Sequence, residues 1–285
     1  MKQLSIVVVN YNSKEFLENC IQSCLKAIRN LDAEIIVVDN NSTDGSKEYI
    51  TTIFPRIIWI QNSKNEGFSK ANNQGVESSE GRYVLILNPD TQLPEDIFEK
   101  IIPFAESKED LGALGVRIVD SENRYRSESK RNIPGPKNTF RKLFIELGIR
   151  RKREGIKGYY EESLGEFEVG EVEILTGCFF FTRREVYKGV GGFDESYFMY
   201  GEDIDLSYTL LKSGYRNYYF GQSTILHYKG GSTVKDKIYY QRFFTAMEIF
   251  IKKHYRRPFY TYITLLTGLK IRYYLALCIA WFQKK

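Results

Sequence analysis

Apolar runs of strand length alternate with stripes of helical period through the first ninety or so residues. Runs rich in β-branched and other apolar residues predict buried strands at 4–9, 34–38, 57–60 and 83–87. An apolar stripe of helical period predicts a helix near 16–28, and shorter helices are expected after Gly45 and at 69–76. This alternation implies right-handed crossovers and an α/β fold, with a mostly parallel central sheet flanked by helices.

Polar residues stand where two of these strands are predicted to end. Asp39 ends the second strand, and Asn88, Pro89 and Asp90 follow the fourth, where proline stops the strand. Open α/β sheets bind ligands beyond the carboxyl ends of their strands. In that position Asp90 suits a divalent cation, which prefers oxygen ligands, and Asp39 suits an N–H donor of a pyrimidine base. Turn and cap chemistry is the alternative explanation of both carboxylates.

The first strand is followed by Asn10-Tyr11-Asn12 and by no glycine-rich turn. The dinucleotide-binding fingerprint and the P-loop both need glycines at this point, because the backbone must approach the phosphates. Both of those nucleotide-binding modes are therefore excluded for the first turn.

The second half of the chain is predicted to be less regular. The expected strands are 111–119, 172–181 and a short strand ending near His227, and the expected helices begin near Arg184 and Gly201. Gly177 is placed where a ligand could approach the backbone of a strand.

A charged stretch from Asp120 to about Gly170 separates these elements. It carries many Lys and Arg residues, including the run Arg150–Arg153. One explanation is a mobile, solvated loop with solubilising charge. The other is a basic lid over the site, which meets a diphosphate acceptor or anionic lipid head groups.

Composition narrows the class of protein further. Among the 285 residues, 42% are hydrophobic and 27% charged, which is typical of a globular protein and excludes a disordered one. The net charge of +5 is too small to indicate a nucleic-acid partner. The four cysteines have neither zinc-site nor disulfide spacing, and no signal peptide is visible, so we expect a reduced, cytoplasmic setting.

Two groups of titratable residues in the second half are candidates for chemistry. Glu202, Asp203 and Asp205 fall in the first turn of a predicted helix, where acids are also favoured simply by the helix dipole. His227 ends a predicted strand, and a lone histidine of this kind is more often structural than a ligand. His254 lies among Lys and Arg residues, and we interpret it as a surface residue.

The composition changes from Lys235 onward. An aromatic, basic helix is predicted at 239–255, and Pro258 ends it. The apolar segment 259–282 is interrupted by Lys270 and Arg272, so each uninterrupted half is shorter than the ~20 residues of a membrane span. An in-plane helix at a membrane surface fits this pattern better. Packing on the domain, or on a second subunit of a homo-oligomer, is the alternative.

Four blocks of the sequence together resemble glycosyltransferase family 2, in particular its rhamnosyltransferase and galactofuranosyltransferase branch. They are 5–12, 37–46, 65–73 and 87–90, and Gly-Glu-Asp-x-Asp at 201–205 and His-x-x-Gly-x-Ser at 227–232 follow in the same order. The resemblance covers roughly the first 230 residues. It implies a GT-A fold, a nucleotide-sugar donor and inversion at the anomeric carbon.

The resemblance also implies roles for individual residues. Asp203 is the expected base that deprotonates the acceptor hydroxyl, with Glu202 or Asp205 orienting the acceptor. Asp39 is expected to contact the base of the nucleotide. The remaining residues expected to line the nucleotide-sugar site are Asn10, Asn12, Asn41, Asn65, Gly67, Asn72 and Asn88.

The family's short acidic motif departs from its usual form here. It reads Asn88-Pro89-Asp90 instead of Asp-x-Asp, so its first carboxylate is missing. The resemblance implies that Asp90 and His227 bind Mg²⁺ or Mn²⁺ together with diphosphate oxygens, and that Asn88 contacts the sugar or ribose. The metal would neutralise charge on the leaving nucleoside diphosphate.

We therefore expect a GT-A domain at 1–234, with the mobile basic loop at about 120–170, and a C-terminal helical segment at 235–285. The expected activity is transfer of a sugar from a dTDP- or UDP-sugar, with dTDP-rhamnose as the preferred donor. The acceptor would be lipid-linked or a polysaccharide, in surface glycan synthesis at the inner face of the cell membrane. The alternatives are a sugar-phosphate nucleotidyltransferase and a non-catalytic glycan- or nucleotide-binding protein of the same fold.

Overall fold

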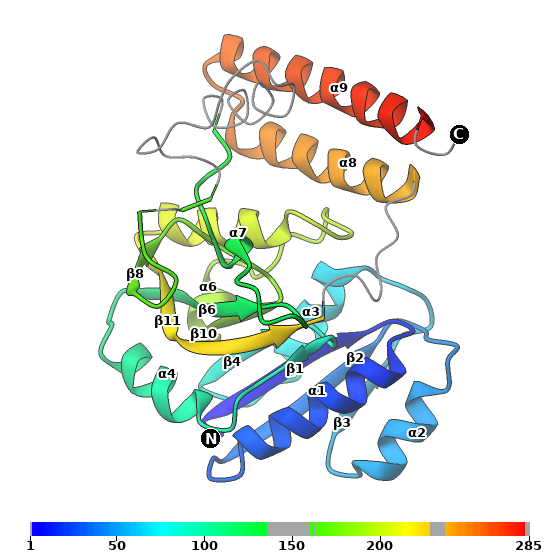
Figure 1. Cartoon of the computed structure of the whole chain (residues 1–285), viewed down its shortest axis with the longest axis vertical. Coiled ribbons are helices and arrows are strands. Elements are labelled where there is room, and N and C mark those ends of the chain that lie inside the picture. Colours follow the sequence, from blue (N-terminus) through cyan, green and yellow to red (C-terminus); the bar gives the residue numbers. More distant parts are fainter. Residues whose placement is uncertain (1, 136–159, 162, 229–236, 283–285) are drawn as a thin grey trace.

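The computed structural model describes residues 2–135, 160–161, 163–228 and 237–282 (Figure 1). Its N-terminal half is built on four parallel strands, joined in turn by three helices. The strands are β1 (Leu4–Asn10), β2 (Ala33–Asp39), β3 (Ile58–Gln61) and β4 (Tyr83–Leu87). The helices are α1 (Lys14–Ala27), α2 (Ser46–Ile53) and α3 (Phe68–Glu77). The predicted alternation of strands and helices is confirmed in this half.

The main sheet of the described residues has nine strands in the order β3-β2-β1-β4-β10-β6-β11-β5, with β8 also paired to β11. The added strands are β5 (Thr91–Gln92), β6 (Leu111–Val119), β8 (Val169–Val172), β10 (Phe179–Arg183) and β11 (Arg216–His227). β10 runs antiparallel between β4 and β6, whereas β6 and β11 are parallel to one another. The sheet is mixed but mostly parallel, as expected.

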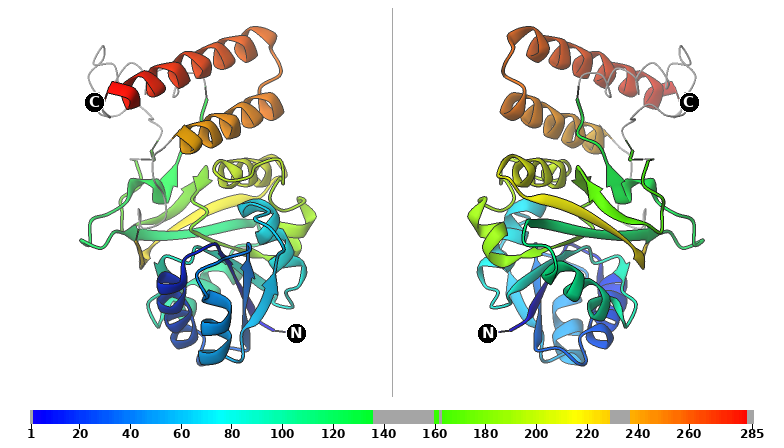
Figure 2. Two further views of the ribbon diagram at one scale, coloured as in Figure 1. Left: turned by 90° about the vertical axis from the view of Figure 1, so that its right-hand side faces the viewer. Right: turned by 90° about the vertical axis from the view of Figure 1, so that its left-hand side faces the viewer.

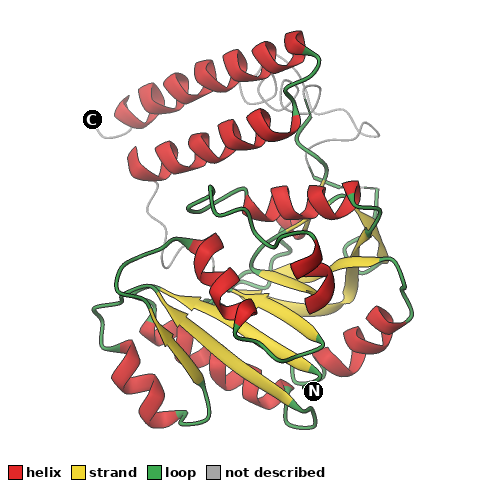
Figure 3. Cartoon of the chain, turned by 180° about the vertical axis from the view of Figure 1, so that it is seen from behind, coloured by secondary structure: helices red, strands yellow, loops and turns green. Residues whose placement is uncertain are grey.

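Helices cover both faces of this sheet (Figure 3). One apolar core lies between the sheet and the helices α1, α2 and α4 (Ile97–Glu106). The opposite face packs against α3, α6 (Arg184–Gly189) and α7 (Glu202–Lys212). Neighbouring residues of β1 and β4 alternate between these cores, which is why both strands are apolar without interruption.

Three details of the second half differ from the sequence predictions. The strand expected at 172–181 is divided into β8, β9 (Ile174–Leu175) and β10, and Gly177 lies in the turn before β10. The strand ending at His227 has 12 residues and is not short. Part of the stretch expected to be a loop is ordered as η1 (Ser127–Ser129) and β7 (Lys130–Arg131), because β7 pairs with β9. The run Arg150–Arg153 lies outside the described residues.

Two long helices, α8 (Lys237–His254) and α9 (Phe259–Phe282), form the C-terminal part of the described chain. They lie side by side across the end of the molecule that carries α7 (Figures 1 and 2). Ala246 and Phe250 of α8 are buried against Ile174, Tyr197 and Ile204 of the body. Within the described ranges, no helix is long and apolar enough to cross a membrane.

Candidate active site

The carboxyl ends of β1 and β2 bring two of the predicted site residues together. Asn10 and Asp39 are partners in the register of the two strands. The Asp39 carboxylate is almost fully buried and accepts four hydrogen bonds, from Asn10 Nδ2, Gln61 Nε2 and the backbone N–H and hydroxyl of Ser42, at 2.6–2.9 Å. Asp39 therefore caps the loop that follows β2. The contact of Asp39 with a nucleotide base stays a prediction. A base that donated to Asp39 would share an oxygen that already accepts hydrogen bonds from the protein.

The loops after β1 and β2 are held to one another beside this carboxylate. Asn12 and Asn41 both have left-handed backbone conformations, with φ of 52° and 64°. The side-chain oxygen of Asn12 accepts a hydrogen bond from the backbone N–H of Thr43 at 2.7 Å. Asparagine tolerates this backbone region better than most residues do, so these positions suit the sharp loops they occupy.

A third loop, before α3, closes onto the second half of the chain. Gly67 has φ of +88°, and a Cβ placed there would lie 2.6 Å from the carbonyl oxygen of Phe198. Asn65 accepts a hydrogen bond from the N–H of Gly67, and the N–H of Phe68 donates to the Phe198 carbonyl at 2.7 Å. Only glycine fits this approach without displacing backbone.

Asn72 and Asn88 occupy different surroundings. Asn72 is buried in α3, and its Nδ2 donates to the Phe68 carbonyl. Asn88 is partly exposed just after β4, where its backbone N–H donates to the Cys178 carbonyl at 3.1 Å.

Asp90 and His227, distant in sequence, lie next to one another in the structure. β5 pairs with the end of β11, and this pairing places His227 Nε2 3.1 Å from Asp90 Oδ1. The two atoms are close, but their geometry is not that of a hydrogen bond. As a result Asp90 Oδ1 is a buried oxygen with no hydrogen-bond partner among the described residues.

This pair can supply an oxygen and a nitrogen ligand to a divalent cation. Nowhere in the described ranges do three or more His, Cys, Asp or Glu side chains gather to hold a metal by themselves, so further ligands would have to come from the substrate. Burial opposes protonation of His227, but the neighbouring Cys178 and Asp90 outweigh it and raise its pKa to about 10. The extra proton would leave on metal binding, because a ligating imidazole must be neutral.

Asp203 is the second residue of α7, and both oxygens of its carboxylate accept hydrogen bonds. Oδ2 accepts hydrogen bonds from Arg131 Nη2 at 2.6 Å and from the N–H of Gly177 at 3.0 Å. Oδ1 accepts one bond, from the N–H of Ile204 at 2.8 Å. The Asp203 side chain approaches the backbone at Gly177, and the approach of a ligand there stays a prediction. Each carboxylate oxygen can accept about two hydrogen bonds, so Oδ1 retains capacity for a further donor.

Glu202 is also buried, but its carboxyl group is not held by hydrogen bonds on both oxygens as that of Asp203 is. Its Oε2 has no hydrogen-bond partner in the part of the chain that the structure describes. Burial, and secondly the charge of Asp203, raise the pKa of Glu202 to about 8. A carboxyl that keeps its proton near neutral pH can donate a hydrogen bond, for example to a sugar hydroxyl.

Asp205 points to the C-terminal helices. Its Oδ1 lies 2.7 Å from His254 Nε2 and accepts a hydrogen bond from the Tyr197 hydroxyl, while Oδ2 is 2.8 Å from Lys253 Nζ. The prediction that His254 is a surface residue is wrong, since its side chain is only 5% exposed. Sequence reasoning failed because the charged neighbours of His254 suggested a solvated face.

Arg131 and Lys253 also contact the acids at the start of α7. Both belong to basic stretches of the sequence, and their partners lie far away along the chain, so no local pattern indicates these contacts.

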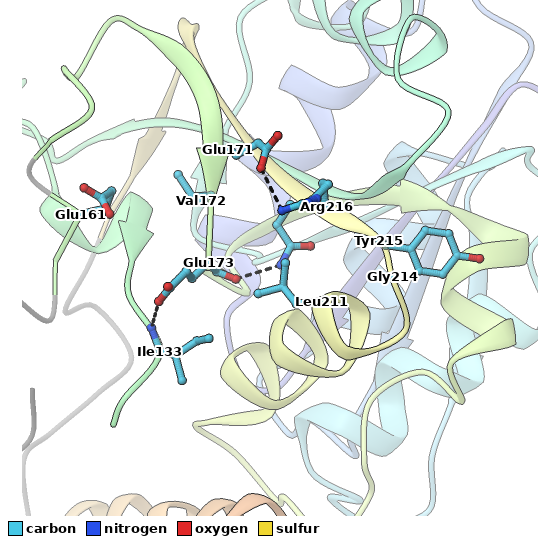
Figure 4. Close-up of a pocket in the computed structure, with 10 residues that line it drawn as sticks. Ile133, Glu161, Glu171, Val172, Glu173, Leu211, Gly214, Tyr215 and Arg216 are labelled. Carbon is cyan, nitrogen blue, oxygen red and sulfur yellow. Dashed lines mark hydrogen bonds and ion pairs between the residues drawn. The ribbon is translucent and has the colours of Figure 1, made fainter. Parts of the chain in front are cut away.

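A separate pocket of about 530 Å³ lies near the C-terminal end of α7 (Figure 4). Its lining includes Glu171, Glu173, Leu211 and Arg216, and none of the predicted site residues. Several of its polar groups already bond within the protein, such as Glu173 with the N–H of Ile133. The pocket is therefore distinct from the candidate active site.

A mixed sheet with Asp90 beside His227 near its strand ends, and three acids in the first turn of α7 (Glu202–Asp205, the acidic turn), is the arrangement expected of a GT-A glycosyltransferase. The chain belongs to glycosyl transferase family 2, whose model matches residues 5–191.

Relatives of known function are consistent with this family. The chain is 28% identical over 244 residues to N-acetylglucosaminyl-diphospho-decaprenol L-rhamnosyltransferase of Mycobacterium tuberculosis, covering 82% of this chain and 78% of that protein. It is 27% identical to the rhamnosyltransferase WbbL of Escherichia coli, covering 78% and 82%. It is 26% identical to a low-salt glycan biosynthesis hexosyltransferase of Haloferax volcanii, covering 94% and 83%.

Solved structures share the fold at lower identity. GalNAc-T7, crystallised with UDP, GalNAc and Mn²⁺, matches with a TM-score of 0.61 at 16% identity, over 87% of this chain and 48% of that one. The chain thus spans about half of GalNAc-T7. Staphylococcus aureus TarS (1–349) matches with a TM-score of 0.59 at 15% identity, over 94% and 70%. At these identities the likeness establishes the GT-A fold alone.

Proposed function

We propose that the protein is an inverting transferase that moves rhamnose from dTDP-rhamnose to a lipid-linked or polysaccharide acceptor during cell-surface glycan synthesis. Two relatives are named rhamnosyltransferases, and one of them is named for a diphospho-decaprenol acceptor. The observation that carries the proposal is the pairing of Asp90 with His227, because it brings together two side chains able to bind a metal, beside Cys178 and the neighbouring Gly177, which contacts Asp203.

The donor would lie over the ends of β1, β2 and β4. Asn10, Asp39 and the loops that carry Asn12 and Asn41 would hold a pyrimidine nucleotide. Asp90 and His227 would bind Mg²⁺ or Mn²⁺, which fits the buried Oδ1 of Asp90, because this oxygen accepts no hydrogen bond from the described residues. When bound, such an ion neutralises charge on the leaving diphosphate.

Asp203 is the proposed base. Arg131 and the N–H of Gly177 hold Oδ2, so the carboxylate has a fixed orientation, and Oδ1 remains able to accept a proton. One displacement follows: the acceptor hydroxyl loses its proton to Asp203 as its oxygen bonds to C1 of the donor sugar and the nucleoside diphosphate leaves. A single displacement inverts the configuration at C1.

The variant Asp203→Asn tests this assignment, because asparagine keeps the size of the side chain. We expect donor binding, measured by thermal shift, to be unchanged and transfer to fall about 100-fold or more, the range for general bases. Asp96→Asn, at an exposed pair with Lys100, is the matched control. Full transfer activity in Asp203→Asn would refute the role of Asp203.

A lipid-linked acceptor would place the protein at the inner face of the cell membrane. Aromatic and aliphatic side chains on α9 are exposed in a way that suits contact with lipid, namely Phe259, Tyr260, Ile263, Ile271 and Tyr274. A homo-oligomer that covers this face is the alternative. Deletion of 259–285 followed by cell fractionation separates the two, since only a membrane contact predicts release of the truncated protein from membranes.

A further inference from the structure

A groove of about 250 Å³ runs between α8 and the segment that leads into the acidic turn. Its apolar lining consists of Tyr197, Phe198, Met199, Ile238, Ala246 and Ile249. Ile238 is 55% exposed and Phe198 36% exposed, so large apolar side chains face solvent here. Its volume is below the ~300–1,000 Å³ of sites that enclose a whole small molecule, so it suits a segment of a longer ligand.

The groove lies next to the proposed reaction site. The Phe198 carbonyl accepts the hydrogen bond from Phe68 and contacts Gly67, in the loop assigned to the donor. Gly201, three residues after Phe198, packs against Ala246 and Met247 of α8. Glu202 and Asp203 follow Gly201 directly in the sequence. The groove is therefore lined by residues that also contact the donor loop and Gly201, the residue before the acidic turn.

A cation marks the edge of this groove. The guanidinium of Arg242 lies 4.5 Å from the centre of the Phe198 ring. Arg242 is exposed at this position. An apolar channel with an arginine at its edge is complementary to a chain that is apolar along its length and anionic at its head.

We propose that this groove binds the first part of the polyprenyl chain of a lipid-linked acceptor, and that Arg242 contacts the phosphate at its head. This inference rests on the proposed function, and it places the acceptor between α8 and the 196–199 segment. Helix α8 is then part of the acceptor site.

The test measures binding of a long-chain polyprenyl diphosphate and of geranyl diphosphate in detergent, with no donor present. Arg242→Ala removes the cation and should weaken binding of both compounds about 10-fold, which corresponds to ~1.4 kcal/mol. Ile238→Glu places a charge in the apolar part, and should weaken binding of the long-chain compound at least as much and that of geranyl diphosphate less. Arg256→Ala, an exposed cation beyond α8, is the control and should change neither.

Unchanged affinity for the long-chain compound in both variants, or no binding by the unaltered protein, would overturn the proposal. So would a loss in Arg256→Ala equal to that in Arg242→Ala, because it would indicate non-specific attraction to the charge of the chain. Donor binding, followed separately by thermal shift with dTDP-rhamnose, distinguishes a failure of this groove from a failure of the proposed function. If the donor binds and polyprenyl diphosphate does not, only the groove is excluded.

Discussion

Removal of the Asp205 carboxylate should detach the start of α7 from α8. The side chains of Asp205 and His254 are only 3% and 5% exposed, so the contact is almost fully shielded from water. Hydrogen bonds to a charged group contribute about 1.5–3 kcal/mol. Lys253 is 38% exposed and keeps its bond to Asp194, so we assign the loss to the buried contacts of Asp205 with His254 and Tyr197 and take about 3 kcal/mol for Asp205→Ala.

The expected loss is large enough to measure by thermal unfolding. A loss of about 3 kcal/mol corresponds to a fall in Tm of about 5 °C for a chain of 285 residues, because the entropy of unfolding is about 2.1 cal/mol/K per residue. Glu248→Gln is the matched control, because Glu248 and Lys252 form an exposed pair on the same helix, and such pairs contribute about 0.3–0.5 kcal/mol. A fall in Tm for Asp205→Ala no larger than that of the control would refute the view that Asp205 anchors α8.

Two further variants test individual features of the site. Because the pKa of Glu202 is raised from 4.5 to about 8, the folded protein keeps a proton that the unfolded chain releases, so stability is lost as pH rises through this window. Glu202→Gln should therefore raise Tm more at pH 8 than at pH 5, and an equal change at both would contradict the assignment. Gly67→Ala should lower the free energy of unfolding by more than about 1 kcal/mol in urea titrations. The backbone at position 67 has φ of +88°, and the Cβ of alanine would collide with the Phe198 carbonyl. Gly189→Ala is the control, because a Cβ added at position 189 meets no atom within 4 Å. An equal loss in this control would refute the steric explanation for Gly67.

The strands and helices of the first half could be predicted because their signals are local. β1 and β4 are uninterrupted apolar runs, and α1 carries a stripe of helical period, so neighbouring residues suffice to identify them. The same signals place Asp39 and Asp90 at strand ends, where the structure has them.

The contacts of the acidic turn could not be predicted in this way. Asp203 is held by Arg131 and Asp205 by His254, and each pair is brought together only by packing of distant elements. In sequence, Arg131 was one of many basic residues and His254 stood among lysines and arginines. Charge composition gives no information on which cation is buried against which acid, because that depends on how β7 and α8 dock.

Asp39 shows how far a single residue can be interpreted from its position. Its place at a strand end suggested a base contact, and its following Asn, Ser and Thr residues suggested a cap. The structure realises the cap, with four hydrogen bonds to the carboxylate. A base contact would have to be added to these bonds, so the nucleotide role of Asp39 depends on a direct binding measurement.

The measurement that tests the account most directly is a thermal-shift titration with dTDP-rhamnose, in the presence and absence of Mn²⁺, on the unaltered protein and on Asp90→Asn. Ligand that binds only the folded state at about 100 times its Kd stabilises by about 2.7 kcal/mol. We predict a rise in Tm with donor and Mn²⁺ together, a smaller rise with donor alone, and loss of the Mn²⁺-dependent part in Asp90→Asn. No response to dTDP-rhamnose or to any other thymidine or uridine nucleotide sugar, with or without Mn²⁺, would contradict the central claim that this protein uses a pyrimidine nucleotide sugar as its donor.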